Sequence, residues 1–386
     1  MKNFFKKRIS KLTDLKGLAS IGIGDIVGSG ITAVFWFFIA SELESEAYGE
    51  IHYLIGIAGV AQIVSLIGNS NVMTVYTAKN INIVSTLTII SLIIGAISSL
   101  TILILFFRID VSFLVLAYIM IQLSNGILLG RKLFKKYLKF ILIQKGLTLV
   151  LGIGFYFTFG EIGIIYALVL SHVHYIFIIV KELKNQKIVW SQLNQKKNFI
   201  INNYSLGLSG SISGQIDKII IAPILGFQLL GNYALALQFI AIITILPTIV
   251  YKYILPQDST GIQNKNLKKG IIIISIVIAV LASILLPYVI PVFFPQYIMT
   301  IDAIQIMSYS VVPATITLVY TSKFLATEMS KNVLIGKITS TGILILGFIF
   351  IAPILGIIGL SIIFVVSSST EALLLVLMDR FGRKNQ

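Results

Sequence analysis

A run of hydroxyl and charged residues interrupts the apolar chain near its middle, between residues 202 and 226. Residues four positions apart share a helical face, and one such face carries Ser205, Ser209, Ser213 and Asp217. Lys218 lies on a second face beside it, in line with Gly214. Ionisable side chains at membrane depth are costly and usually face a cavity or a partner. The pattern predicts a binding surface on which Lys218 attracts an anionic group.

A structural interpretation of the same stretch stays open. Asp217 and Lys218 could neutralise each other, and the glycines could serve only close helix packing. Adjacent residues on a helix do not face each other, which favours the binding interpretation.

Two carboxylates elsewhere are candidates for ion coupling. Asp25 shares a helical face with Ser29 and Thr32, and Glu371 follows the run Ser-Ser-Ser-Thr at 367–370. A carboxylate inside a membrane can bind and release a proton or hold Na⁺. The alternative for Asp25 is a hydrogen bond to Ser29 or to nearby backbone.

Other polar side chains within apolar runs are predicted to contact cargo. Gln62, Asn69 and Asn125 carry amides that suit sugar hydroxyls, although such groups also hold transmembrane helices together. Lys145 lies about two turns into its run and would contact a phosphate, or it would extend its ammonium toward the membrane surface.

Several chemistries are disfavoured by the composition. The chain has no cysteine, hence no disulfides or thiol chemistry. Its three histidines lack an accompanying acidic cluster, so we expect no metal site and no cofactor. No G-x-x-x-x-G-K-[ST] motif is present, which argues against ATP hydrolysis. The predicted outer loops are too short for a catalytic domain, so we expect the protein not to be an enzyme.

The elements that must position these residues are membrane helices. The chain of 386 residues is 57% hydrophobic and only 12% charged, whereas soluble domains carry about a quarter charged residues. A span needs about 20 apolar residues. Twelve runs qualify, with boundaries uncertain by several residues: 17–41, 50–76, 82–107, 111–130, 138–159, 161–180, 201–225, 229–255, 269–294, 300–323, 334–354 and 356–378.

The positions of the basic residues support this division. Of the 30 Lys and Arg residues, all but Arg108, Lys145 and Lys218 fall in the two tails or in loops on one side. Basic loops stay on the cytoplasmic side, so both termini are predicted to be cytoplasmic in a multi-pass protein of the cytoplasmic membrane. The net charge of +15 is explained by these loops rather than by nucleic-acid binding.

The longest polar loop, 181–199, divides the runs into six and six. We therefore expect an all-α membrane protein with two six-helix bundles, residues 1–199 with a basic tail and linker, and residues 200–386. Two related halves with a substrate path between them are common among transporters.

Five segments also resemble a known family. They are 35–40 (Phe-Trp-Phe-Phe-Ile-Ala), 46–51 (Glu-Ala-Tyr-Gly-Glu-Ile), 74–79 (Thr-Val-Tyr-Thr-Ala-Lys), 217–226 (Asp-Lys-Ile-Ile-Ile-Ala-Pro-Ile-Leu-Gly) and 230–238 (Leu-Gly-Asn-Tyr-Ala-Leu-Ala-Leu-Gln). The chain resembles the oligosaccharide flippases of polysaccharide biosynthesis, of the O-antigen type, within the multidrug/oligosaccharidyl-lipid/polysaccharide exporter superfamily.

The resemblance implies two bundles around a central cavity that opens alternately to each side. It implies a polyprenyl-phosphate- or pyrophosphate-linked oligosaccharide as cargo, lipid and H⁺ or Na⁺ as further partners, and glycan-assembly enzymes nearby. One alternative is a cation-coupled multidrug exporter of the same superfamily. Another, a membrane glycosyltransferase, is disfavoured by the short outer loops.

Overall fold

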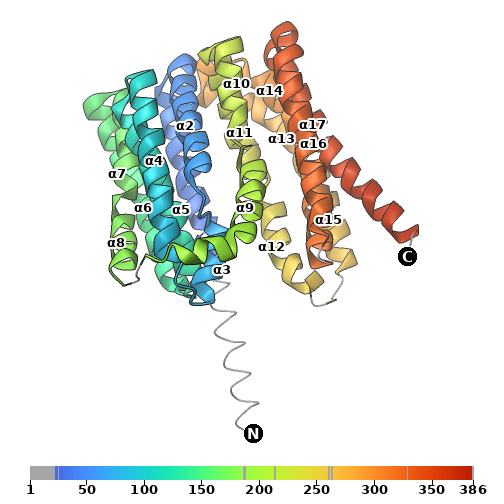
Figure 1. Cartoon of the computed structure of the whole chain (residues 1–386). Coiled ribbons are helices and arrows are strands. Elements are labelled where there is room, and N and C mark those ends of the chain that lie inside the picture. The colour runs from blue at the N-terminus through green and yellow to red at the C-terminus, as the bar shows by residue number, and fades with distance from the viewer. Residues whose placement is uncertain are drawn as a thin grey trace. The chain divides into compact units, whose positions relative to one another are not determined.

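The computed structural model describes residues 22–24, 26–185, 188–212, 214–259, 261, 264–327 and 329–384. Within these ranges every regular element is helical (Figure 1). Among the described residues, ten helices are long and apolar enough to cross a membrane, and the bent pair α11 (Phe227–Ile243) and α12 (Ile245–Ser259) makes an eleventh candidate. The predicted all-α, multi-pass membrane fold is confirmed.

Contacts divide the chain into two compact units. The first comprises Met1–Phe35 and Ile57–Ser211, and the second comprises Trp36–Gly56 and Ile212–Gln386. The helix Gly22–Glu42 and helix α2 (Ser45–Ser65) each contribute residues to both units.

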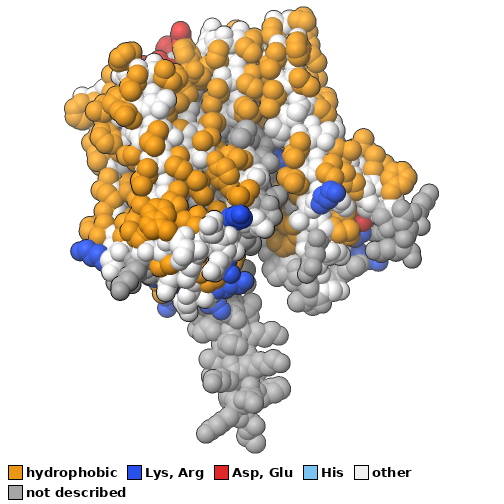
Figure 2. Space-filling view, in the orientation of Figure 1, with side chains coloured by type: hydrophobic (Ala, Val, Ile, Leu, Met, Phe, Trp, Pro, Cys, Tyr) orange, Lys and Arg blue, Asp and Glu red, His pale blue; other side chains and the backbone are white. Residues whose placement is uncertain are grey.

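The first unit is completed by seven α-helices and a short 3₁₀ turn. They are α3 (Ser70–Ala78), α4 (Val84–Phe106), α5 (Ile109–Gly130), α6 (Phe134–Phe159), α7 (Glu161–His172), η1 (Val173–Tyr175), α8 (Ile176–Asn185) and α9 (Ser191–Ile212). Figure 2 shows many hydrophobic side chains along the long helices of this unit, such as α4 and α6, and Lys and Arg side chains near their lower ends. Exposed apolar side chains such as Ile97 and Leu100 on α4 suit a lipid-facing surface.

Polar side chains inside the first unit bond to one another, as they must where water is absent. Gln144 on α6 donates to Thr148 at 3.0 Å, and the Thr148 hydroxyl lies 3.0 Å from that of Ser171 on α7. The α6–α7 corner turns at Gly160, whose φ of 65° disfavours other residues.

In the first unit, an ion pair joins the C-terminal end of α5 to α8. Arg131, the C-cap of α5, contacts Glu182, whose side chain is fully buried. Arg131 itself is 33% exposed. Removing one partner of such a pair leaves the other charge without compensation.

We therefore expect Arg131→Met to lower the free energy of unfolding by about 1–3 kcal/mol, less than for a wholly buried pair because Arg131 is partly solvated. The double variant Arg131→Met/Glu182→Met should recover most of the loss. Thermal unfolding of the purified protein in detergent measures both. A double variant less stable than Arg131→Met would contradict the expectation.

The second unit contains α10 (Ile216–Leu225), α11, α12, α13 (Lys265–Phe293), η2 (Pro295–Tyr297), α14 (Thr300–Met307), η3 (Ser308–Ser310), α15 (Val311–Ala326), α16 (Ser330–Phe350) and α17 (Ala352–Lys384). Helices α16 and α17 pack along each other, and Ser367 of α17 donates to the Ser340 carbonyl of α16 at 2.7 Å. Helices α11 and α14 are tied by the Thr300 hydroxyl, which lies 3.0 Å from Asn232 Oδ1.

Residues 36–56 belong to the second unit, and hydrogen bonds and close backbone packing hold them there. The Gln296 amide donates to the carbonyls of Ala40 and Leu43, at 3.1 and 3.0 Å, and so caps the end of the first long helix. Farther on, the backbones of α2 and α11 touch at Gly49 and Gly231, because a Cβ built on Gly49 would lie 2.8 Å from the Gly231 nitrogen. Only glycine permits so close an approach.

Candidate functional site

The predicted span 201–225 is a broken helix. Helix α9 ends at Ile212 and α10 begins at Ile216, with Gly214 and Gln215 in a turn between them. Glycine weakens a helix because it loses the most backbone freedom on folding. The expected single face from Ser205 to Asp217 is therefore wrong, since the helix does not continue through it. Ser213 lies outside the described residues, as does the side chain of Ser209, whose backbone is in α9.

Lys218 lies in the first turn of α10 and its side chain turns back over the break. The ammonium donates to the Gly214 carbonyl and to Gln215 Oε1, both at 3.1 Å. Its side chain is 14% exposed. A carbonyl released by a helix break at membrane depth needs a donor, and Lys218 supplies it. Among the described residues the third N–H of the ammonium has no hydrogen-bond acceptor.

Asp217 lies beside Lys218, but its carboxylate accepts no hydrogen bond from the lysine ammonium. The nearest carboxylate oxygen is 4.0 Å from Lys218 Nζ, and the carboxylate accepts a hydrogen bond from the Lys218 backbone N–H at 2.8 Å. Asp217 is buried and lies next to the phenol of Tyr233 on α11. The two charges attract each other, yet the lysine retains a donor for another group.

His52 of α2 is a member of this cluster that the sequence did not reveal. It is buried, it lies one turn before Gly56, which packs against Lys218, and its Nε2 has no hydrogen-bond partner among the described residues. Its ring contacts those of Trp36 and Tyr48, with centroids 4.6 and 4.5 Å apart. Gly56 allows the approach, since a Cβ there would lie 3.1 Å from Lys218 Cβ.

A sequence signal for this contact exists. Gly49, His52 and Gly56 follow one another at steps of three and four, which places them on one face of α2. A histidine between two glycines on one helical face indicates close contact with another helix. Among the described residues no group of three His, Asp or Glu side chains could hold a metal ion.

Lys145 in the first unit resembles Lys218 in that it lies well inside a predicted span. It is half-buried on α6 and lies against Gly28, since a Cβ on Gly28 would be 3.5 Å from Lys145 Cγ. His172 of α7 is close enough to interact with its charge. No described residue forms a hydrogen bond or ion pair with Lys145. Asp25, the predicted coupling carboxylate, lies outside the described residues.

The remaining predicted residues come from other helices, and of these Asn69 contacts α9 of the broken span. Asn69 caps α3 by accepting from the Val72 N–H at 3.0 Å, and it donates to the Asn203 carbonyl at 2.7 Å. Gln62 is buried on α2, and Asn125 Oδ1 on α5 is buried without a hydrogen-bond partner among the described residues. Glu371 accepts from Ser340 at 3.1 Å and lies 3.6 Å from Lys337 Nζ.

Outside the spans, one buried phenol holds the segment 36–56 in the second unit. The Tyr297 hydroxyl donates to the Leu43 carbonyl at 3.1 Å. Burial raises the pKa of Tyr297, and the charge of Glu44 raises it further. The phenol therefore stays protonated, and the hydrogen bond persists at any physiological pH.

Comparison with known proteins bears on the fold. No protein-family model and no curated protein sequence matches the chain. The structure is similar to that of a multidrug resistance MATE family transporter of the MOP superfamily in an inward-facing conformation, with a TM-score of 0.70, 15% identity, and coverage of 95% of this chain and 98% of that one. An outward-facing MATE structure matches at a TM-score of 0.63 and 16% identity, covering 95% of both chains.

A third similar structure is a MOP superfamily transporter from Pyrococcus furiosus, with a TM-score of 0.63, 18% identity and coverage of 95% of both chains. It is described as having a binding pocket of reverse polarity that suggests a different function. These likenesses extend over nearly the whole chain, so this membrane protein has the fold of the MATE transporters of the MOP superfamily.

Proposed function

We propose that this protein is a transporter that moves a polyprenyl-phosphate- or pyrophosphate-linked oligosaccharide across the cytoplasmic membrane by alternating access. The observation that carries the proposal is Lys218, a cation at the break of a membrane helix with one N–H donor left over among the described residues. Broken helices commonly form the substrate sites of transporters. A phosphate group is a natural acceptor for the remaining proton.

Lys145 supports the same choice of cargo. Each unit has one lysine that lies well away from the ends of its predicted span, Lys145 and Lys218, and Lys145 has no carboxylate partner among the described residues. Intramembrane cations mark the paths of substrates and ions. Two such cations favour an anionic cargo over a cationic drug. The polar side chains of Gln62, Asn125 and Ser205 would then meet the sugars.

A cation-coupled multidrug exporter is the second candidate, favoured by the fold itself, because two of the similar structures are multidrug resistance transporters. The Pyrococcus furiosus protein supports the first candidate, since a reversed pocket polarity is described for it on the same fold. The buried Asp217 carboxylate is the residue that would serve a cationic drug.

Ion coupling would drive either activity. We propose Asp25 and Glu371 as the carboxylates that exchange H⁺ or Na⁺. A single charge crossing 100 mV contributes about 2.3 kcal/mol, enough to bias two conformations by roughly fiftyfold. Glu371 would have to leave Lys337 and Ser340 when it binds an ion.

Sealed proteoliposomes test the two candidates directly. They carry a fluorescent lipid-linked oligosaccharide and a membrane-impermeant quencher outside, and an ion gradient is then imposed. We expect the quenched fraction to change with the gradient only in vesicles that contain the protein. A constant glycolipid distribution, together with uptake of a cationic dye under the same gradient, would overturn the proposal and identify a drug exporter.

A further inference from the structure

A basic pocket opens in the second unit where four helices end. Its volume is about 420 Å³, and its walls come from the end of α12, the start of α13, the last turns of α15 and the far part of α17. Four lysines and two aspartates line it, which leaves two positive charges in excess: Asp258, Lys265, Lys268, Lys269, Lys323 and Asp379. The predicted topology puts this end of the unit at the cytoplasmic surface.

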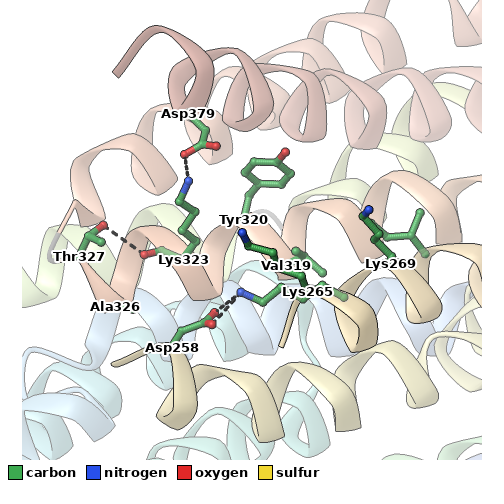
Figure 3. A pocket seen from close by; sticks show the side chains of 11 residues that line it. Asp258, Lys265, Lys269, Val319, Tyr320, Lys323, Ala326, Thr327 and Asp379 are labelled. Atoms are coloured by element: carbon green, nitrogen blue, oxygen red, sulfur yellow. Dashed lines mark hydrogen bonds and ion pairs between the residues drawn. The ribbon is translucent and has the colours of Figure 1, made fainter. Parts of the chain in front are cut away.

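Both aspartates are already engaged in holding the walls together. Asp258 on α12 accepts from Lys268 at 2.7 Å through both oxygens, and from the Ser322 hydroxyl on α15 at 2.6 Å. Asp379 on α17 pairs with Lys323 on α15. These contacts link four helices, so they give the pocket a fixed frame (Figure 3).

Lys268 and Lys323 pair with the two aspartates, so the two positive charges in excess are those of Lys265 and Lys269. They are four residues apart on the first turns of α13, so they lie on one face, and both line the pocket. Neither forms a hydrogen bond or ion pair with a described residue. Lysines at a helix N-terminus oppose the helix dipole, and like charges four residues apart repel. The pair therefore costs stability unless an anion lies between them.

The pocket lies where the basic start of α13 meets its apolar part, which is where the headgroup of a membrane lipid would lie. Ile272 lines the pocket, and one residue farther Ile273 is 62% exposed on the apolar, lipid-facing side of α13. Ile273 lies four residues after Lys269, so an exposed apolar face of α13 begins one turn beyond this lysine. Basic pockets between transmembrane helices at the cytoplasmic side suit anionic headgroups. Tyr320 and Thr327 add hydroxyl groups to the lining.

We propose that this pocket binds the phosphate group of an anionic phospholipid between Lys265 and Lys269, with the acyl chains along α13. The site is independent of the transported cargo, and it does not rest on the proposed function. A free phosphate ion has the same chemistry at the lysines but lacks the contact with α13.

The test uses the purified full-length protein in detergent and native mass spectrometry to count bound lipid. Phosphatidylglycerol is the probe, phosphatidylcholine is the zwitterionic comparison, and inorganic phosphate is the soluble competitor. We expect wild-type protein to retain one phosphatidylglycerol with preference over phosphatidylcholine. The variant Lys265→Gln/Lys269→Gln should bind it about 30-fold more weakly, since each lysine near an anionic surface contributes about fivefold.

Helix α6 offers a matched control. Lys135 and Lys139 are also an exposed pair four residues apart at the start of a long helix. Lys135→Gln/Lys139→Gln removes the same charge and should leave phosphatidylglycerol binding unchanged. Equal losses in the two double variants, or no loss in the α13 variant, would overturn the proposal.

Competition distinguishes the two sources of phosphate. If millimolar inorganic phosphate leaves the lipid bound, the occupant is the phospholipid as proposed. If phosphate displaces it at equimolar concentration, the acyl chains add nothing, and the lipid assignment is overturned.

Discussion

Replacing Lys218 with alanine is expected to reduce glycolipid movement in proteoliposomes by roughly 30-fold or more, because truncating a buried, hydrogen-bonded charge costs about 2–5 kcal/mol. The variant removes the cation that is to meet the cargo phosphate and leaves the Gly214 carbonyl without its donor. The measurement is the gradient-dependent change in the quenched fraction of the labelled glycolipid.

The controls separate a binding defect from a folding defect. Lys331→Ala removes an exposed lysine at the start of α16 and should transport normally. Lys218→Arg keeps the charge and should retain part of the activity, whereas Lys218→Gln keeps only a donor and should not. Each variant must first elute from size-exclusion chromatography as wild type does. Full transport by a well-folded Lys218→Ala would remove this residue from the proposed site.

Replacing Gly231 with valine is expected to abolish recovery of folded protein. A Cβ at this position would lie 2.7 Å from the Ser45 carbonyl carbon and 3.2 Å from the Gly49 nitrogen. These are backbone atoms of α2, so the strain cannot be relieved by a rotamer change. Overpacking a core typically costs about 1–3 kcal/mol when side chains can move, and a rigid backbone contact costs more.

The measurement is the monodisperse yield after extraction and the apparent melting temperature in detergent. Gly154→Val on α6 is the matched control, because a Cβ on Gly154 would meet no atom within 4 Å. It adds the same side chain at an exposed position of another long helix and should leave the yield near that of wild type. A stable Gly231→Val protein would show that α2 and α11 do not pack at this point.

Much of the fold could be predicted from the apolar runs. Length and hydropathy identify most spans, because the bilayer requires long apolar helices whatever their partners. The predicted second span, 50–76, was less accurate, since α2 ends at Ser65 and α3 begins at Ser70. Asn69 at that boundary is a favoured N-cap residue, so its capping role was visible in the sequence.

The candidate site was predictable only in part. Asp217 and Lys218 were found because charges are rare in apolar runs, but the break before them was not, since a single glycine does not always end a helix. The spacing of Gly49, His52 and Gly56 indicates a close helix contact, but it does not identify the partner, so the approach of His52 to Lys218 depends on packing between segments far apart in the chain. The predicted domain boundary at 199 and 200 and the roles of the site residues stay predictions.

The sharing of residues 36–56 with the second unit has a consequence for biogenesis. Their partners Gly231 and Gln296 are synthesised long after them. At about 5–20 residues per second, roughly 10–50 s separate the translation of Leu43 from that of Gln296. During this interval the Gly49 face and the carbonyls at the end of the first helix lack their native partners. Insertion of the nascent chain thus includes a waiting period in which the lipid or the insertion machinery must shelter this segment.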